Sequence, residues 1–334
     1  MATLVACLGA CAAPPDVVEP GAFHETVALT YDNDVFTRSD DNYTNGVALT
    51  WIRGPVARER DGSLADRFAR LWRGAPFLGD DREELYVAMG LGHEIFTPDD
   101  ITLADPPRDD QPYAGVLFVD LALARLRPDR SDNWQLRLGL VGPSSGAEWV
   151  QTKVHETIGV DVPEGWDTQL PDEPIINLDY TRATEWLTSG DMSDAGARVV
   201  PVFGAGAGTY FTGVTAGLYG EAGWNLPDPV GAFSLRQGVG PQFLGDIGAS
   251  GQPSVSFFAG LGGYATAHYL PLDGTVFSSS RSVDTEPLVG FGSFGATVRY
   301  GSLSVTFVGS VATDQFATQR SATKFGSLTV AYRF

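Results

Sequence analysis

The chain has 334 residues, of which 43% are hydrophobic and 19% are charged, and its formal net charge is -19. Such an excess of acid argues against nucleic acid as a partner, because phosphates attract Lys and Arg, and against simple adhesion to anionic lipid. It suits a secreted or surface protein, or one that gathers divalent cations, with a merely solubilising acidic surface as the alternative.

The amino-terminal segment 1–22 is predicted to be an export signal or a lipoprotein-like leader. It is rich in apolar and small residues and contains both cysteines of the chain, Cys7 and Cys11. The run LGAC resembles a lipoprotein processing box with Cys11 as the lipid-bearing residue, and an ordinary cleaved signal is the alternative. No disulfide framework is expected in the rest of the chain, because it has no cysteine.

Residues 23–334 are predicted to form one β-domain. Runs of alternating apolar and polar residues, typical of strands, recur along the chain. We expect about twelve: 25–36, 42–53, 84–96, 113–126, 133–142, 173–187, 197–211, 212–225, near 253–270, 286–300, 301–314 and 324–334. Their length is near the roughly ten residues that a tilted strand needs to cross a bilayer.

Many of these runs carry small residues on one face and bulky apolar residues on the other, which indicates a lipid-facing outside. The last run alternates Leu328, Val330, Tyr332 and Phe334 with smaller or polar residues, and it resembles the assembly signal of bacterial outer-membrane barrels. An even number of antiparallel strands closes without an edge. We therefore expect an all-β, closed antiparallel transmembrane β-barrel of about twelve strands.

Two segments have helical spacing instead, at 63–74 and 146–159. The second is expected to place Trp149, Val150, Val154 and Ile158 on one side, with Gly159 near its end. It follows the fifth predicted strand. If the amino terminus is periplasmic, residues 143–172 form a large extracellular loop that contains this short helix.

Polar side chains crowd the junction of the first two predicted strands. Asn33 and Asp34 fall near the end of the first strand, and Tyr43 and Thr44 open the second. Carboxylate, amide and hydroxyl oxygens at a strand rim are ligands for a hard cation such as calcium, and they can also position an oxyanion. The alternative is an acidic turn that only caps the hairpin.

His155 lies late in the predicted helix, with Gln151 and Glu148 four and seven residues before it on the same face. A neutral His can take a proton from water. His155 as base, a metal as electrophile and water as attacker would suffice for ester hydrolysis without a protein nucleophile. Ser144 and Ser145 are alternative nucleophiles, and they rank lower because they lie in a Gly/Pro turn without an evident strand–turn–helix elbow.

Three quoted stretches carry a resemblance: NDVF with NYTNGV in 33–51, DDQPYAGVLF in 109–118, and GPSSGAEWVQTKVHETIG followed by GWDTQ in 142–169. They resemble the lipid A deacylase family of outer-membrane barrels, the LpxR type, over most of the chain after residue 25. The resemblance implies a twelve-stranded, multi-pass barrel in the bacterial outer membrane with its active site facing outside. It implies hydrolysis of the 3′-linked acyloxyacyl group of lipid A in lipopolysaccharide, with calcium as cofactor.

The resemblance also implies roles for individual residues. The family's essential Asn-Asp pair matches Asn33 and Asp34, its strand-two Thr/Ser matches Thr44, and its loop histidine matches His155, the expected general base. The expected metal ligands are Asp34, Asp161 and Glu148, with Asp161 standing where some relatives are expected to have Glu. Gln151, Tyr43 and Arg108 are expected to contact the substrate or to support the residues that do.

Two other functions stay open at this point. One is an outer-membrane barrel that only binds or permeates, and the other is an esterase that acts on phospholipid or another acylated surface lipid. A monomer without a nucleic-acid partner is expected in each case.

Overall fold

The structure, a computed structural model, describes residues 24–33, 42–54, 67, 85–226, 238 and 253–334. The predicted leader 1–22, Asp34 and the predicted helix 63–74, apart from residue 67, lie outside the described residues.

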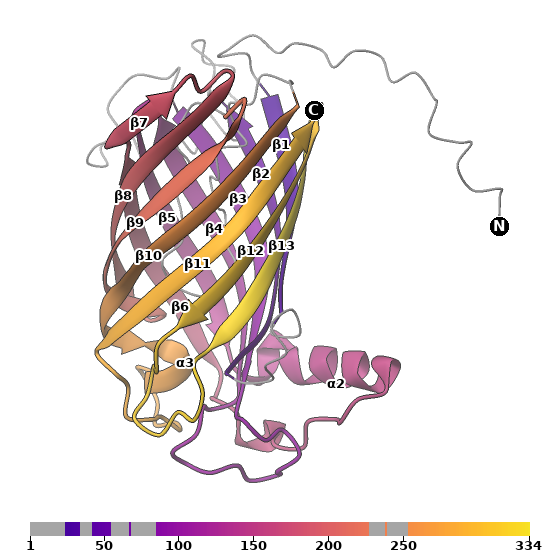
Figure 1. Cartoon of the computed structure of the whole chain (residues 1–334). Coiled ribbons are helices and arrows are strands. Elements are labelled where there is room, and N and C mark those ends of the chain that lie inside the picture. The colour runs from indigo at the N-terminus through magenta and orange to yellow at the C-terminus, as the bar shows by residue number, and fades with distance from the viewer. Residues whose placement is uncertain (1–23, 34–41, 55–66, 68–84, 227–237, 239–252) are drawn as a thin grey trace, which may run out of the picture.

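The described residues form one antiparallel sheet that closes into a barrel (Figure 1). Its strands are β1 (His24–Asn33), β2 (Asn42–Gly54), β3 (Leu85–Thr97), β4 (Ala114–Leu126), β5 (Arg130–Val141), β6 (Glu173–Thr184), β7 (Leu187–Gly190), β8 (Ala195–Gly208), β9 (Phe211–Trp224), β10 (Ser254–Tyr269), β11 (Leu288–Tyr300), β12 (Leu303–Ala312) and β13 (Lys324–Arg333). The helical elements are η3 (Pro143–Ser145), α2 (Ala147–Ile158), η4 (Trp166–Thr168) and α3 (Leu270–Asp273).

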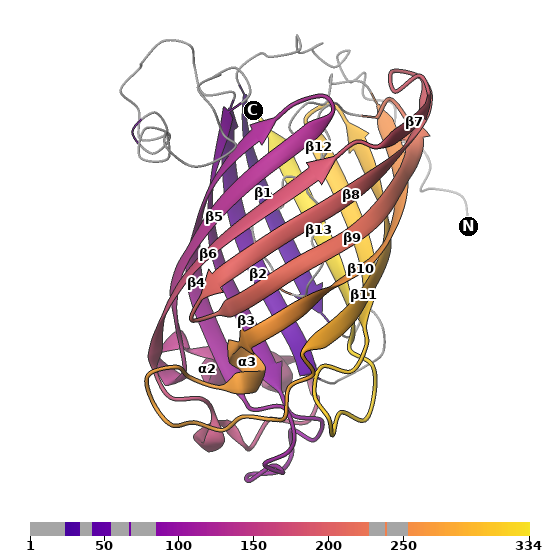
Figure 2. The same ribbon diagram turned by 90° about the vertical axis from the view of Figure 1, so that its left-hand side faces the viewer.

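Closure takes place at two seams. β1 pairs with β13, and β6 pairs with β8, which lie side by side in Figure 2. The short β7 pairs with β8 beside this ring, so that twelve strands close the barrel, as predicted. The sequence did not predict β7. The predicted strand 173–187 is divided in the structure, where β6 ends at Thr184 and β7 begins at Leu187.

The two ends of the barrel differ. At one end, which we call the terminal rim, Phe334 N–H donates to the carbonyl of Glu25, so that the last strand ends beside the start of β1. At the other end, the loop rim, lie α2, α3 and the loops that join β3 to β4, β5 to β6 and β10 to β11 (Figure 1).

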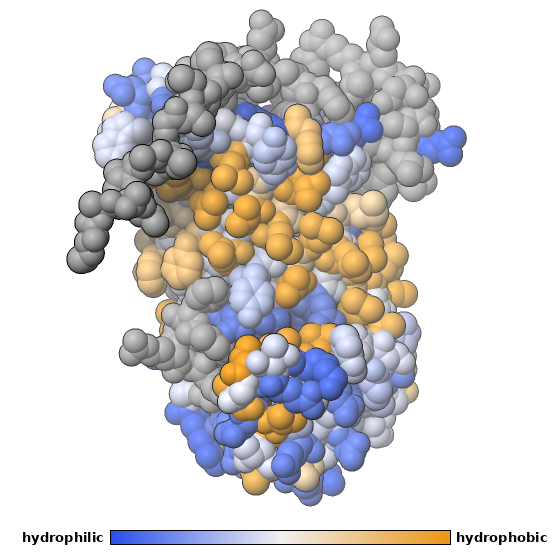
Figure 3. All heavy atoms as spheres, turned by 90° about the vertical axis from the view of Figure 1, so that its right-hand side faces the viewer, coloured by the Kyte–Doolittle hydropathy of each residue, from blue (hydrophilic) through white to orange (hydrophobic). Residues whose placement is uncertain are grey.

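The outer face of the wall is apolar. Strand residues alternate between buried and exposed, and the exposed ones include Leu29, Leu49, Leu91, Phe203 and Leu261. On the face that Figure 3 shows, hydrophobic side chains gather in a band across the wall, with more hydrophilic residues toward the loop rim. This pattern confirms the predicted lipid-facing outside. No helix among the described residues is long and apolar enough to cross a membrane.

Aromatic side chains fill the lumen behind the loop rim. Phe96 of β3 and Tyr269 of β10 stand on opposite sides of the ring, six strand positions apart, yet their ring centroids are 6.5 Å apart. Tyr43, Tyr210 and Phe325 belong to the same buried cluster. The interior at this height is therefore a packed core and not an open channel.

The loops of this rim are tied to one another across the barrel end. Gln111 Nε2 donates to the carbonyl of Pro271 over 2.8 Å. The Glu173 carboxylate accepts the backbone N–H groups of Val276 and Phe277, both at 2.7 Å. These bonds join the β3–β4 loop and the start of β6 to the β10–β11 loop.

Charged side chains are paired deeper in the lumen. Arg137 of β5 donates two bonds of 2.9 Å to the carboxylate of Asp120 and one of 3.3 Å to Glu94. Its guanidinium also lies 3.5 Å from the centroid of the Phe118 ring. Tyr210 donates to Glu94 over 2.6 Å. All of these side chains are buried, so each charge depends on its partners.

Candidate functional site

The helix α2 stands on the outer face of the barrel wall. Val116, Phe118 and Asp120 of β4 point into the lumen, so Gly115 points outward by strand alternation. A Cβ at Gly115 would lie 2.2 Å from Cβ of Ala147 at the start of α2. The absence of a side chain at Gly115 thus lets α2 approach the wall closely.

A small apolar cluster fixes this end of the helix. Ile95 of β3 and Tyr113 in the β3–β4 loop pack with Ala147 and Trp166, and Val150 lies against them. Burial raises the pKa of the Tyr113 hydroxyl well above its usual range, and this hydroxyl donates to the carbonyl of Ile101 over 3.2 Å. The β3–β4 loop is thereby held against the base of α2.

A β-bulge places Thr44 on the same outer side. The register between β2 and β3 shifts between Tyr43, which pairs with Phe96, and Asn45, which pairs with Ile95. Thr44 is the extra residue, and its hydroxyl is 2.7 Å from that of Thr97, the next outward residue after Ile95. Bulges commonly re-aim a side chain in this way at the rims of barrels.

Strand alternation assigns the neighbouring predicted residues to different faces. Asp32 points into the lumen, where it accepts a 3.0 Å bond from the Tyr43 hydroxyl, so Asn33 points outward. The structure therefore brings Asn33, Thr44 and α2 to the outer side of four adjacent strands at the loop rim. It does not bring Tyr43 there, because that side chain is fully buried in the luminal core.

Glycines begin and end α2, and the second one shapes the surroundings of His155. Gly146 and Gly159 both have left-handed backbone, with φ of 74° and 76°, and the N–H of Gly159 caps the carbonyl of His155. The predicted helix with Gly159 near its end is confirmed. The turn after Gly159 leads the chain back, so that the Asp161 carbonyl lies 2.6 Å from Nδ1 of His155.

That contact determines the tautomer of a neutral His155. A backbone carbonyl only accepts, so Nδ1 must carry the hydrogen in this bond. Nε2 of the neutral ring then holds the free electron pair and can accept a proton. His155 itself is partly exposed.

Gln151 lies one helical turn before His155 and is buried. Its Oε1 accepts a 2.9 Å bond from the indole Nε1 of Trp166. The Trp166 ring packs on Tyr113, with 4.8 Å between ring centroids. Gln151, for which a supporting role was predicted, thus has a specific hydrogen-bond partner in the β5–β6 loop.

The apolar side chains of α2 are not all on one side, contrary to expectation. At about 100° per residue, Trp149 and Ile158 lie about 180° apart around the helix. Ala147 and Gln151 are buried, whereas Trp149, Val154 and Ile158 are exposed by 67%, 49% and 63%. The helix is therefore anchored at its first turns, and its second half extends beyond the wall, as Figure 1 shows.

The two serines before α2 are engaged elsewhere. Ser144 uses both its N–H and its hydroxyl to bond the Asp172 carboxylate, at 2.8 and 2.7 Å. Ser145 is buried, and its Oγ would lie 2.3 Å from a Cβ at Gly115. Neither hydroxyl is hydrogen-bonded to His155, which weakens their assignment as nucleophiles.

The remaining predicted residues are exposed. Glu148 lies two helical turns before His155, about 10.5 Å along the axis. The Asp161 carboxylate faces solvent while its carbonyl holds His155, and Arg108 is exposed in the β3–β4 loop.

The donor set at this rim is one of oxygens, which suits calcium better than a transition metal. Asn33, Thr44 and Asp161 offer amide, hydroxyl and carboxylate oxygens on the outer side. Within the described ranges, no three His, Cys, Asp or Glu side chains gather closely enough to hold a metal ion. A calcium ion here would therefore need Asp34 or non-carboxylate oxygens to complete its ligands.

Several structurally important residues were missed at the sequence level. Glu94 and Asp120 are acidic residues within largely apolar strand runs, which is a usable signal of a luminal position, but their pairing through Arg137 is not visible in the sequence. Trp166 lay within a quoted motif without a role.

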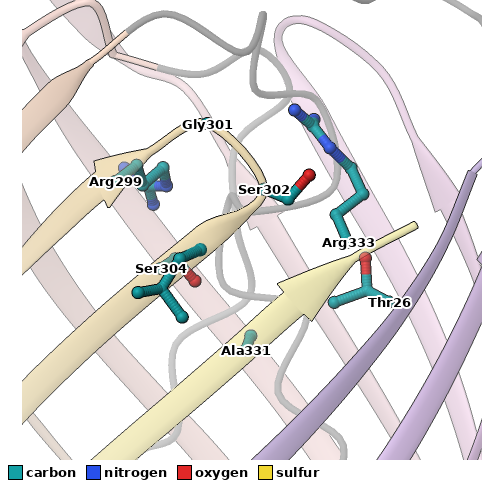
Figure 4. Close-up of a pocket in the computed structure, with 8 residues that line it drawn as sticks. Thr26, Arg299, Gly301, Ser302, Ser304, Ala331 and Arg333 are labelled. Carbon is teal, nitrogen blue, oxygen red and sulfur yellow. The ribbon is translucent and has the colours of Figure 1, made fainter. Parts of the chain in front are cut away.

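A small pocket of about 20 Å³ lies at the other end of the barrel (Figure 4). It lies beside the turn of the β11–β12 hairpin, and Arg299, Arg333 and Thr26 line it. It is remote from α2 and contains none of the predicted site residues.

Comparisons with known proteins bear on the family and the fold of the chain. A family profile described as "Outer membrane protein LpxR" matches residues 2–334. The structure of LpxR from Salmonella typhimurium is similar with a TM-score of 0.72 and 16% identity, over 92% of this chain and 99% of that chain. The β-domain of the Bordetella autotransporter BrkA (TM-score 0.42, 12% identity, 93% and 98% coverage) and the porin NanC (0.35, 7%, 93% and 98%) are less similar. No match was found among curated protein sequences.

Proposed function

Because the chain belongs to the LpxR family of outer membrane proteins, we propose that it is an esterase that removes the 3′-linked acyloxyacyl group of lipid A. The loop rim, with α2, faces the outside of the cell in this proposal, so that the site meets lipopolysaccharide in the outer leaflet. The barrel acts as a monomer.

One observation carries the proposal: the bond between His155 Nδ1 and the carbonyl of Asp161. It presets Nε2 of the neutral ring to receive a proton from water, which is the task of a general base. The water then attacks the ester carbonyl. No described serine hydroxyl is paired with His155, which supports water as the nucleophile.

Outward-facing polar groups near the helix supply the rest of the site. Asn33 and Thr44 hold the water or the developing oxyanion, as amide and hydroxyl groups do in hydrolytic sites. Asp34 and Asp161 would supply carboxylate oxygens to calcium. Glu148 would be a further ligand only if its carboxylate reached the ion from a position two helical turns before His155. Calcium, when bound, supplies positive charge that polarises the ester carbonyl.

The position of these groups favours a lipid substrate over a solute in the lumen. They lie on the outer wall at the edge of the apolar band, whereas the lumen behind them is filled by aromatic side chains. Lipid in the leaflet can reach the outer wall sideways. The packed lumen gives no support to permeation.

The test is mass spectrometry of lipid A from a host that expresses the wild type or His155→Ala, with calcium or a chelator added to the membranes. We expect the wild type to remove one acyloxyacyl unit and the variant to lose about 10²- to 10⁴-fold in rate. Unchanged lipid A with a folded wild type in calcium would contradict the proposal. Release of fatty acid from phospholipid instead would point to the related esterase.

Asp161→Ala separates the two roles of that residue. If only its carbonyl acts, by holding His155, the variant keeps its activity and its calcium requirement. If its carboxylate binds calcium, the variant needs more calcium to reach half of its maximal rate. A loss that excess calcium does not restore would argue against the ligand role.

A further inference from the structure

The geometry points to Trp166 as a positioning residue that holds the catalytic helix α2 in place through Gln151, an inference that rests on the proposed function. Trp166 is not expected to touch the substrate. It acts on His155 through the helix, and its contribution should appear in the rate of the chemical step.

Trp166 is held in place by contacts that do not involve the helix. It is 2% exposed and packs against Tyr113, whose backbone carbonyl accepts the N–H of Leu170 over 2.9 Å. Gly165 allows this approach, because a Cβ there would lie 2.6 Å from the Tyr113 ring. The indole is therefore part of a rigid base formed by the β3–β4 and β5–β6 loops.

The bond from this base to the helix has a defined direction. An indole N–H only donates, so the Gln151 atom that faces it, 2.9 Å away, is the amide oxygen. Gln151 is 4% exposed, so water does not readily replace this donor. The bond is made one helical turn before His155, at the limit of the part of α2 that is buried.

The consequence for His155 follows from how the helix is supported. Within α2 only Ala147 and Gln151 are fully buried, and the residues after them project from the wall. Ala147 and Val150 pack against the wall at the start of the helix, and Gln151 is the last buried contact before the projecting half, so it helps to fix the direction of that half. Without this contact α2 can tilt, and a displacement of about 1 Å at a catalytic group can cost about 10²-fold in rate.

Trp166→Phe is the decisive variant, because it keeps an aromatic ring on Tyr113 and removes the N–H. We expect kcat to fall about tenfold to a hundredfold while KM changes less than about twofold. Trp134→Phe is the matched control, because Trp134 packs on Tyr180 with the same 4.8 Å separation of ring centroids, in strands away from α2. It should leave kcat unchanged.

A double-mutant cycle tests the route through Gln151. If Trp166 acts through that residue, kcat of Trp166→Phe/Gln151→Leu should be no lower than that of the worse single variant. Losses that multiply would overturn the route, and a kcat for Trp166→Phe within about twofold of the wild type would overturn the inference.

Hydrogen exchange of peptides from α2 measures how firmly the helix is held, and it does so independently of any activity assay. Exchange in 147–158 should become faster in Trp166→Phe and stay unchanged in Trp134→Phe, and equal exchange in all three proteins would overturn the inference. A wild type that is as inactive as His155→Ala would overturn the proposed function, and with it the catalytic part of this inference. An active wild type with an unaffected Trp166→Phe would overturn only the role of Trp166.

Discussion

The lumen behind the loop rim and the outer wall beneath α2 share strands β3 and β4, yet the two regions are built differently. On the luminal side, Arg137 is held between Asp120 and Glu94, and every partner is buried. On the outer side, His155 sits on a helix that is supported only at its first turns. If the proposed function holds, a single wall separates the contacts that stabilise the barrel, on its luminal side, from the residues of the candidate site, on its outer side.

The largest effect on stability is expected from the luminal side. Arg137→Ala leaves two buried carboxylates without their cation, which should lower the free energy of unfolding by about 3–5 kcal/mol. Urea unfolding in detergent micelles measures this loss. Arg320→Ala is the control, because Arg320 is exposed and lies 3.9 Å from Asp99, a pair that contributes at most about 1 kcal/mol. The hydrolytic rate per folded molecule should not change in either variant.

A pair of glycines contrasts the two faces directly. A Cβ at Gly115 meets Ala147 of α2, whereas a Cβ at Gly92 in β3 meets the Phe118 ring in the lumen at 2.2 Å. Gly115→Val should displace α2 and lower the rate by about 10²-fold with an intact barrel. Gly92→Val should instead lower stability by about 1–3 kcal/mol through overpacking. Kinetics and urea unfolding of both variants check this, and equal profiles would refute the division of roles.

Loss of the hydrogen bond between Tyr210 and Glu94 should lower the free energy of unfolding less than loss of the Arg137 guanidinium. Tyr210→Phe removes one hydrogen bond to a buried carboxylate, which is worth about 1.5–3 kcal/mol. The urea midpoint should fall while the kinetic constants remain those of the wild type. A change in kcat without a change in stability would show that the lumen also serves the site.

The smallest change in stability is expected at the outer end of α2. Gly159 has φ of 76° and open space around it, so Gly159→Ala should cost only about 1 kcal/mol through backbone strain. The rate should fall more than this suggests, because the turn after Gly159 carries the Asp161 carbonyl to His155. Full activity in Gly159→Ala would argue that this carbonyl does not set the function of His155.

Residues of the candidate site were predictable to different degrees. The resemblance selected His155, Asn33 and Thr44, and strand alternation with a bulge then places the last two on the outer side. Tyr43 was predicted to belong to the site as well, but its side chain faces the lumen. The sequence could not show this, because residues at a bulge cannot be assigned to a face before the strand register is known. Asp34 lies outside the described residues, so its expected roles stay predictions.

The features that depend on local periodicity were predictable from the order of residues alone. Alternation over about ten residues predicted twelve barrel strands, and the glycine stop predicted the end of α2, although the apolar spacing within this helix did not define one buried face. The folded barrel was needed to see which residues meet between elements: Arg137 with Glu94, Trp166 with Gln151, and α2 with the outer wall at Gly115. Periodicity follows from backbone geometry within one element, whereas these contacts depend on the curvature of the closed sheet, which turns Arg137 and Glu94 toward each other in the lumen, and on how the loops fold back onto the wall.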